Sequence, residues 1–300
     1  ARRIAKLCLR SYALSATPML NNLMEIYGVF RVINPELFGN VSDFKNAFVK
    51  SIKIGGRFEK IIGYKNIPQL KEILKDHFIG HQKHEVSHQL PPIIRKFTEF
   101  ELDPDHQSSY DEVVSEQFDN SPDESTLSPK ERIINHLTIL TYLQRVVDYQ
   151  QLIFPDRSGS TKFNMLKEYI DYQLQDEKLV IFSRFKMSLN IIEFDLRSLY
   201  PKLPIFRITG DESQIQREQN RISFTENKGR SIMLITTAGT MALNLQSANH
   251  LIFYSYPWSS GFLIQIIGRV HRIGSLLPVI INFFIAKDTI DQHVFEIMSK

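Results

Sequence analysis

The chain has 300 residues, 43% of them hydrophobic and 23% charged, with a net charge of +3, which is ordinary for a folded protein of one large or two modest domains. No apolar run approaches the roughly 18 residues that span a membrane, and we predict no signal peptide at its start. The single cysteine, Cys8, excludes an internal disulfide and a multi-cysteine zinc site, and it favours a reducing, intracellular compartment.

Residues 1–177 predict a mainly helical region. The apolar spacing over 21–33 is that of an amphipathic helix, which Asn34-Pro35 ends. Leu90-Pro-Pro92 precedes a predicted strand over 95–102, and the acidic, Ser- and Pro-containing stretch 119–130 predicts a surface loop. Further helices are predicted at 2–12, 41–51, 67–77, 104 onward, 131–152 and 161–174, with a short strand at 12–15.

From residue 178 onward, short buried strands alternate with helices, which predicts an α/β fold with a parallel sheet covered on both faces. Ligands of such sheets bind outside the carboxyl ends of the strands. We therefore expect Thr209-Gly210, the segment 236–239 and Arg269 to lie at or beyond these ends. The predicted strands are 179–182, 205–208, 232–235, 250–254 and 279–285, and the predicted helices run through 199, over 213–225, around 261–270 and from 289 onward.

Two arginines, Arg269 and Arg272, stand three residues apart within 265–274 (QIIGRVHRIG), so on a helix they would share one face. Gln265 lies one turn earlier. An arginine fork can hold phosphate oxygens in a bidentate manner, and two forks on one face could stabilise a transferring phosphoryl group. Two surface arginines at a helix end are the simpler alternative, and the arginine pair by itself would favour it.

Two other segments carry hydroxyl groups at expected strand ends. The stretch 235–245 (ITTAGTMALNL) ends a strand in small and hydroxyl residues that could reach a phosphate, or that could form a plain turn. The stretch 14–18 (LSATP), followed by Asn21-Asn22, is a weak motif alone.

Charge is distributed unevenly along the chain. Lys and Arg outnumber Asp and Glu by 16 to 8 in residues 1–100 and by 14 to 9 in residues 178–300. In residues 101–177 the acidic residues predominate instead, with 16 Asp and Glu against 6 Lys and Arg. Two basic ends around an acidic middle are compatible with a polyanion that is held between two lobes. They are equally compatible with an ordinary solvated surface.

Taken in this order, the segments resemble the Swi/Snf-type DNA translocases of the superfamily-two helicases. The resemblance covers nearly the whole chain, is weaker over about 100–160, and is most specific in the last motif. The matching segments are 14–27 (LSATPMLNNLMEIY), 179–185 (LVIFSRF), 208–210 (ITG), 235–245, the aromatic lead-in 256–258 (YPW) and 265–274.

The resemblance implies three domains and two sets of site residues. Residues 1–92 would be the C-terminal part of a first RecA-like lobe with a helical protrusion. Residues 93–160 would be a linker or helical segment with the acidic loop, entering lobe two. Residues 161–300 would be the second RecA-like lobe. ATP and Mg²⁺ would be the cofactors of the intact motor, and double-stranded DNA, held without sequence reading, would be the partner, with no membrane involved.

The first implied set serves the nucleotide, and the second serves DNA. Arg269 and Arg272 would be arginine fingers facing ATP on the first lobe, with Gln265 helping to position them. Gly239, Asn244 and Gly268 would belong to the cofactor side, and the first two would shape the loop that joins nucleotide to nucleic acid. The residues implied to contact the phosphates of one DNA strand are Ser183, Thr209, Gly210, Thr236 and Thr237, and those implied to couple the first lobe to hydrolysis are Ser15 and Thr17.

The sequence also departs from the family's pattern. It contains no Gly-x-x-x-x-Gly-Lys-Ser/Thr loop and no Asp-Glu pair at a strand end to hold Mg²⁺. We therefore expect a piece of a longer ATPase, completed by a first-lobe segment or a partner chain; a natural half-motor is the alternative. The family's Ala-Gly-Gly-x-Gly run is 238–242 (AGTMA) here, and its basic Arg-Arg-x-Lys segment is 80–83 (GHQK). Both changes put the coupling and bracing roles of those segments in doubt.

Several rival interpretations remain. His77, His81, His84 and His88 have metal-ligand spacing on a helix, but no carboxylate or cysteine completes a shell, so we predict no metal. Asp211-Glu212 is interpreted as a helix N-cap with a first-turn acid. The main alternatives for function are a non-hydrolytic module that binds nucleic acid or a partner protein, and an RNA helicase of the same superfamily.

Overall fold

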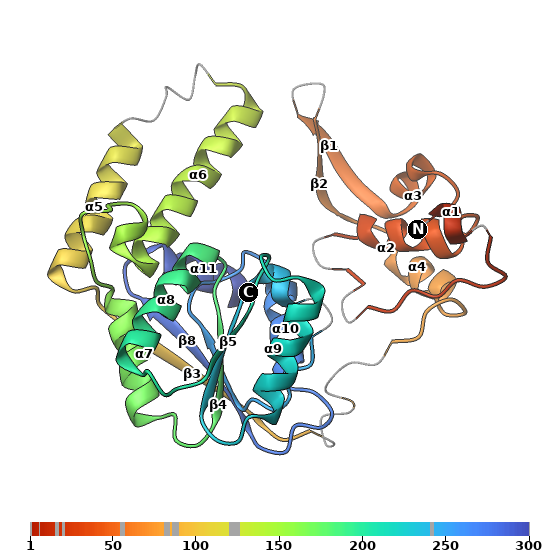
Figure 1. Cartoon of the computed structure of the whole chain (residues 1–300). Helices are drawn as coiled ribbons and strands as arrows, with labels where there is room; N and C mark the ends of the chain where they lie inside the picture. Colours follow the sequence, from red (N-terminus) through yellow and green to blue (C-terminus); the bar gives the residue numbers. More distant parts are fainter. Residues whose placement is uncertain are drawn as a thin grey trace. The chain divides into compact units, whose positions relative to one another are not determined.

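The computed structural model describes residues 2–5, 7–15, 18–19, 22–54, 58–80, 85, 90–119, 127–240 and 243–299 (Figure 1). The chain divides into two compact units, residues 1–86 and residues 87–300. The strand predicted near residue 95 lies in the sheet of the second unit. The division of residues 93–300 into a linking segment and a lobe stays a prediction.

The first unit packs three helices around a small aromatic core. α2 spans Met24–Ile33, α3 spans Val41–Phe48 and α4 spans Ile67–Leu74. Their apolar faces meet at Phe44, which is 1% exposed and whose ring centroid lies 5.0 Å from that of Phe38. A capping box starts α3, because the Asn40 side chain accepts from backbone N–H groups of the first turn and Asp43 accepts in return.

The start of the chain and the end of α3 differ from the predictions. Helix α1 covers only Arg2–Ala5, and residues 12–15 form no strand. The helix predicted over 41–51 ends at Phe48, where the chain turns into an antiparallel pair of strands, β1 (Val49–Ile54) and β2 (Phe58–Tyr64). These strands have exposed side chains on both faces along much of their length, so the hairpin shows no core-facing stripe in the sequence.

The second unit is built on a six-stranded sheet with every pair parallel, in the order β3-β8-β7-β4-β6-β5. This confirms the predicted α/β fold class. The central strands are continuous apolar runs, as expected for parallel strands that are covered on both faces. The strands are β3 (Ile93–Phe100), β4 (Lys178–Phe182), β5 (Ile205–Ile208), β6 (Ser231–Ile235), β7 (His250–Phe253) and β8 (Val279–Ala286).

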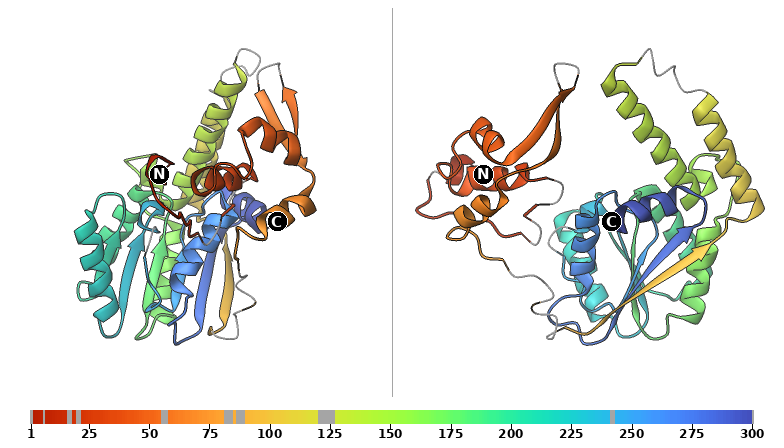
Figure 2. Two further views of the ribbon diagram at one scale, coloured as in Figure 1. Left: turned by 90° about the vertical axis from the view of Figure 1, so that its right-hand side faces the viewer. Right: turned by 180° about the vertical axis from the view of Figure 1, so that it is seen from behind.

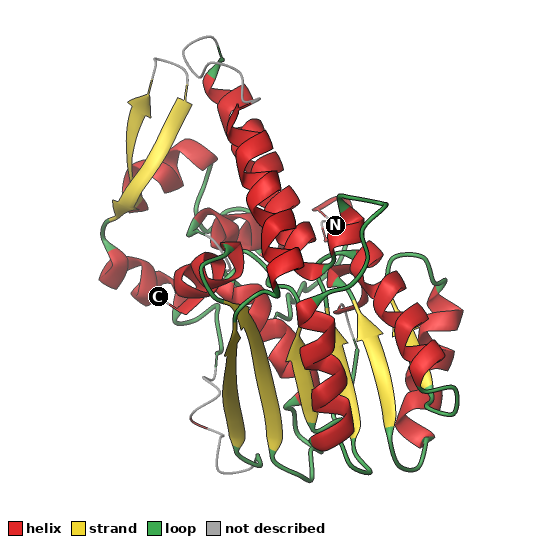
Figure 3. Cartoon of the chain, turned by 90° about the vertical axis from the view of Figure 1, so that its left-hand side faces the viewer, coloured by secondary structure: helices red, strands yellow, loops and turns green. Residues whose placement is uncertain are grey.

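Helices cover both faces of this sheet. α7 (Thr161–Tyr172) and α8 (Lys186–Leu199) lie on one face, and α9 (Gln214–Glu226) and α10 (Ser260–Val270) lie on the other (Figures 1 and 2). α5 (Pro104–Asp119) and α6 (Pro129–Asp148) pack on each other, and α6 extends beyond the sheet (Figure 3). Short turns complete the unit, namely η2 (Gln150–Leu152) and η3 (Thr237–Thr240), and α11 (Ile290–Ser299) contacts α6 and β8.

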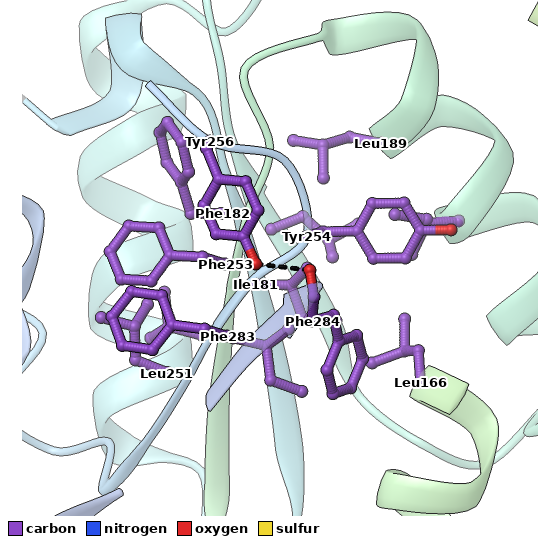
Figure 4. Close-up of a cluster of buried hydrophobic side chains, with 14 of the residues drawn as sticks. Leu166, Ile181, Phe182, Leu189, Leu251, Phe253, Tyr254, Tyr256, Phe283 and Phe284 are labelled. Carbon is purple, nitrogen blue, oxygen red and sulfur yellow. Dashed lines mark hydrogen bonds between the residues drawn. The ribbon is translucent and has the colours of Figure 1, made fainter. Parts of the chain in front are cut away.

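Alternation along the strands sorts the core into two layers (Figure 4). Phe182, Phe253 and Phe283 lie on the α10 side, where the rings of Phe253 and Phe283 stack at 5.3 Å. Tyr254 and Phe284 lie on the α7 side of the same strands. Because successive strand residues point to opposite faces, one apolar run supplies both layers. Among the described helices, none combines the length and the apolar character needed to cross a membrane.

A charged cluster is buried beside this core. Lys162 of α7 lies between Asp148 at the end of α6 and Asp291 of α11, and all three side chains are fully buried. The Lys162 ammonium lies 3.2 Å from Asp148 Oδ1, and Ser188 Oγ donates to Asp148 Oδ2 at 2.7 Å. Burial raises the pKa of Asp148 to about 6, although the Lys162 charge opposes that shift. The cluster therefore joins three helices through ionic contacts that solvent does not screen.

Candidate functional site

Serine and threonine side chains follow several strands at the carboxyl edge of the sheet. Figure 3 shows the strands of this sheet and the loops that leave them. Ser183 directly follows β4 and Ser255 lies just beyond β7. Their hydroxyl oxygens are 2.7 Å apart, and both residues are fully buried. The backbone N–H of Arg184 donates to Ser255 Oγ at 3.2 Å. Ser255 was missed by sequence reasoning; its position directly beyond a buried strand, like that of Ser183, is the signal that could have found it.

The Thr209-Gly210 turn lies at the carboxyl end of β5 and is held by Glu212. The Glu212 carboxylate accepts hydrogen bonds from the Thr209 N–H at 2.5 Å and from its hydroxyl at 2.8 Å, and it pairs with Arg207 at 2.7 Å. The interpretation of Asp211-Glu212 as a helix cap is wrong, because Ser213 is the N-cap of α9. Glu212 instead fixes the turn that presents Thr209 and Gly210.

Replacing Glu212 with glutamine should lower the free energy of unfolding by about 1–2 kcal/mol at pH 7, because a charged acceptor of two hydrogen bonds and an arginine is lost. Burial raises the pKa of Glu212, but the Thr209 hydrogen bonds and the Arg207 charge outweigh it, so the net pKa lies below 4.5. The stabilisation is therefore present above pH 4.5 and disappears as the pH falls through the lower folded-state pKa. Urea unfolding of both proteins at pH 7 and in acid measures this; a difference that persists at low pH contradicts it.

The arginine pair lies elsewhere, at the end of α10. The helix ends at Val270, so the prediction that Arg269 and Arg272 share one helix face is wrong. His271 is extended, with φ −92° and ψ 91°, and its ring Nε2 lies 2.7 Å from the carbonyl oxygen of Pro91. Gly274 then takes a φ of +100°, which favours glycine, and turns the chain toward β8.

Arg269 does not lie at the carboxyl edge, which corrects a second expectation. α10 runs back from the carboxyl end of β7, so its last turn lies beside the segment that enters the amino end of β7. The Leu245 N–H donates to the Arg269 carbonyl oxygen at 2.9 Å. The structure therefore separates the arginines from the strand-end hydroxyls.

The side chains of Arg269 and Arg272 are close enough for their charges to interact. Burial and the neighbouring charge of Arg272 both lower the pKa of Arg269. Arg272 Nη1 donates to Asn244 Oδ1, which fixes one guanidinium against the strand-connecting segment. Within the residues that the structure describes, neither guanidinium pairs with a carboxylate. Two neighbouring cations without an acid form a site suited to an anion.

The segment from Thr236 to Leu245 joins the two groups. Thr236 is buried at the carboxyl end of β6, Thr237 begins η3, and Asn244 reaches Arg272. An added Cβ at Gly210 would lie 3.8 Å from that of Ala238, so the Thr209-Gly210 turn sits beside η3. A single stretch of chain thus runs from the strand-end hydroxyls to the arginines.

The remaining predicted residues take ordinary positions. Gln265 lies in α10 one turn before Arg269, Gly239 lies in η3, and a Cβ at Gly268 would meet nothing within 4 Å. Ser15 lies in the first unit and belongs to no helix or strand, and Thr17 falls outside the described residues. His81, His84 and His88 also fall outside them; among the residues placed, no group of three or more His, Cys, Asp or Glu side chains could hold a metal.

Comparison with known protein families covers most of the chain. The family described as "SNF2-related domain" matches residues 8–152, and the "Helicase conserved C-terminal domain" matches residues 161–274. The chain belongs to the SNF2-type helicase-like family. The second match spans the strand-end hydroxyls of β4, β5 and β6, the joining segment and both arginines. The match to the helicase C-terminal domain thus includes every predicted site residue of the second unit.

Individual SNF2-type relatives are distant but extend over the whole chain. A "Putative ATP-dependent helicase/translocase YwqA" of Bacillus subtilis is 26% identical over 98% of this chain and 32% of the relative. A "SWI/SNF-related matrix-associated actin-dependent regulator of chromatin subfamily A-like protein 1" of Xenopus laevis is 27% identical over 100% of this chain and 30% of the relative. The chain therefore spans about a third of the length of these curated relatives.

One solved structure extends the likeness to the fold. The "Sulfolobus solfataricus SWI2/SNF2 ATPase core in complex with dsDNA" is 24% identical, with a TM-score of 0.57 over 96% of this chain and 60% of that chain. At this identity the likeness concerns the fold.

Proposed function

We propose that the chain forms the C-terminal motor portion of an ATP-dependent translocase or remodeller of double-stranded DNA. The observation that carries this proposal is a pair of neighbouring arginines that, among the described residues, has no carboxylate partner. The segment after β6 joins this pair to hydroxyl groups at the carboxyl edge of the sheet. The membership of the SNF2-type family and the dsDNA named for the Sulfolobus relative support it.

In this proposal Arg269 and Arg272 act on the phosphates of a nucleotide held mainly outside the chain, by a first-lobe segment or a partner chain. ATP with Mg²⁺ supplies the transferable phosphoryl group when bound. Arg269, half-buried and repelled by Arg272, is more favourably placed when an anion lies between the two. Asn244 holds Arg272 in position, and Gln265 supports Arg269 from the preceding turn.

The DNA-binding part of the proposal rests on the carboxyl edge. Of the residues assigned to one DNA strand, Gly210 and Thr237 are exposed and would contact its phosphates directly. Ser183, Thr209 and Thr236 are buried, and the N–H and hydroxyl of Thr209 already donate to Glu212, so these three would shape the edge from beneath. Phosphate contacts of this kind give affinity without sequence reading, as a translocase needs. Gly239 and Asn244 would shape the loop that joins the two sites, and Ser15 and Thr17 would couple the first lobe to hydrolysis. DNA as partner also agrees with the intracellular compartment expected from the sequence.

Duplex DNA should stimulate ATP hydrolysis by the intact protein far more than duplex RNA of the same sequence. An A-form duplex presents its phosphates with a different groove geometry, so it should not fit contacts set for B-form DNA. Steady-state hydrolysis with each duplex at matched phosphate concentration makes the comparison. Equal stimulation favours the RNA helicase alternative. Duplex binding without any hydrolysis favours the non-hydrolytic module, which the lost glycines of 238–242 suggest.

A further inference from the structure

A second arginine pair lies at the carboxyl edge, around Phe185. Arg184 directly follows Ser183, and Arg145 comes from the last turn of α6. Their guanidinium carbons lie 5.3 and 5.5 Å from the centre of the Phe185 ring, and that of Arg184 also lies 5.9 Å from the centre of the Trp258 ring. Stacking on aromatic faces orients both planar groups while leaving their N–H edges free to donate.

Neither of these arginines is neutralised. No carboxylate pairs with Arg145 or Arg184 in the part of the chain that the structure describes, whereas Arg157, Arg197, Arg207 and Arg221 all pair with glutamates. The Arg184 guanidinium donates to Gln144 Oε1, a neutral group, at 2.5 Å. Burial and the charge of Arg145 lower the pKa of Arg184. Two half-buried cations near each other are costly unless an anion joins them.

The position of the pair indicates which anion it would take. The Arg184 backbone is tied to the Ser183–Ser255 hydroxyl pair, so both guanidiniums border the edge to which the proposed function assigns DNA phosphates. We propose that Arg145 and Arg184 form a binding site for backbone phosphates of duplex DNA, which extends the contact surface from the sheet onto helix α6. The inference rests on the proposed function for the identity of the polyanion, but its residues are different.

A backbone phosphate fits this site better than an acidic protein side chain does. The two forks provide several N–H donors with few acceptors, which suits the oxygens of a phosphate. The site is open at the edge of the sheet and does not lie inside a closed cavity, because both arginines are only half-buried. α6 would thereby be held to DNA at its base, next to the ionic cluster of Asp148.

The salt dependence of duplex binding tests the site. Fluorescence anisotropy of a labelled duplex, measured with the 300-residue chain between 50 and 200 mM KCl, gives the slope of log affinity against log salt concentration. The double variant Arg145→Gln/Arg184→Gln should flatten this slope by up to about 1.8, because each lost phosphate contact removes about 0.9. The variant Arg197→Gln, which alters an arginine paired with Glu193, should keep the wild-type slope.

Four further results decide the inference. The double variant Arg145→Lys/Arg184→Lys keeps both charges and should keep most of the slope; if it loses as much as the glutamine variant, the effect comes from packing and the phosphate site is rejected. An unchanged slope in the glutamine variant also rejects it, and leaves the proposed function intact. If the wild-type chain shows no salt-dependent duplex binding, the proposed function fails first. The fourth result comes from the melting temperatures of the wild type and the glutamine variant, measured in inorganic phosphate and in chloride. If the glutamine variant loses the stabilisation by phosphate but keeps the wild-type salt slope for duplex binding, the site binds free phosphate and the DNA assignment is overturned.

Discussion

Arg269→Ala in the intact motor is expected to lower kcat for ATP hydrolysis by roughly 10³- to 10⁵-fold, the usual contribution of an arginine finger. Duplex affinity should stay close to that of the wild type. The reason is geometric: Arg269 lies at the end of α10, beside Leu245, and away from the strand-end hydroxyls and the Arg145–Arg184 pair. The substitution should therefore affect the nucleotide site and spare the nucleic-acid edge.

Two comparisons make this result specific. Arg269→Lys keeps the charge but loses the planar fork, so it should recover only a small part of the activity. Arg197→Ala removes an exposed arginine of α8, on the opposite face of the sheet, and should leave hydrolysis unchanged. Steady-state hydrolysis at saturating duplex measures kcat, and anisotropy measures affinity. Near-normal turnover by Arg269→Ala would remove the arginine-finger assignment, and lost duplex binding would place Arg269 on the DNA side.

The fold of the second unit was predictable because buried parallel strands appear in the sequence as continuous apolar runs. Leu179 to Phe182 and Ile232 to Ile235 are fully buried on both faces, so each appears as an unbroken apolar run that no surface segment would contain. The helices between them show apolar spacing of period 3.6. The β1–β2 hairpin lacks this signal, because its strands are exposed and pair only with each other. The sequence signal that could have predicted this hairpin is the Gly55-Gly56 pair, which stands between the segments that form β1 and β2.

The sequence suggested the residues of the candidate site but not their arrangement in space, and their roles stay predictions. The pattern around Arg269 and Arg272 identifies the motif, yet the helix ends between them, because His271 binds the Pro91 carbonyl 180 positions away in the sequence. The pairing of Ser183 with Ser255 likewise depends on β7 lying next to β4, which is a property of the strand order. Contacts of this range leave no local trace in a single sequence.

Lys162→Met is expected to lower the free energy of unfolding by about 3–5 kcal/mol, because it leaves two buried carboxylates without their cation. All three side chains are fully buried, so water cannot replace the lost charge. A typical domain is stable by only about 5–15 kcal/mol, so the loss is a large part of the total. Urea unfolding followed by circular dichroism at pH 7 measures it.

A triple variant separates the ionic contribution from the packing of the long Lys162 side chain. Asp148→Asn/Lys162→Met/Asp291→Asn removes every charge of the cluster, so it should recover most of the stability that Lys162→Met alone loses, as replacement of a whole buried ionic group often does. Ser188 can still donate to the side chain at position 148. A triple variant as unstable as Lys162→Met would mean that packing dominates. Recovery would mean that the three charges act as one unit, holding the base of α6 to α7 and α11 beside the edge where we propose that DNA binds.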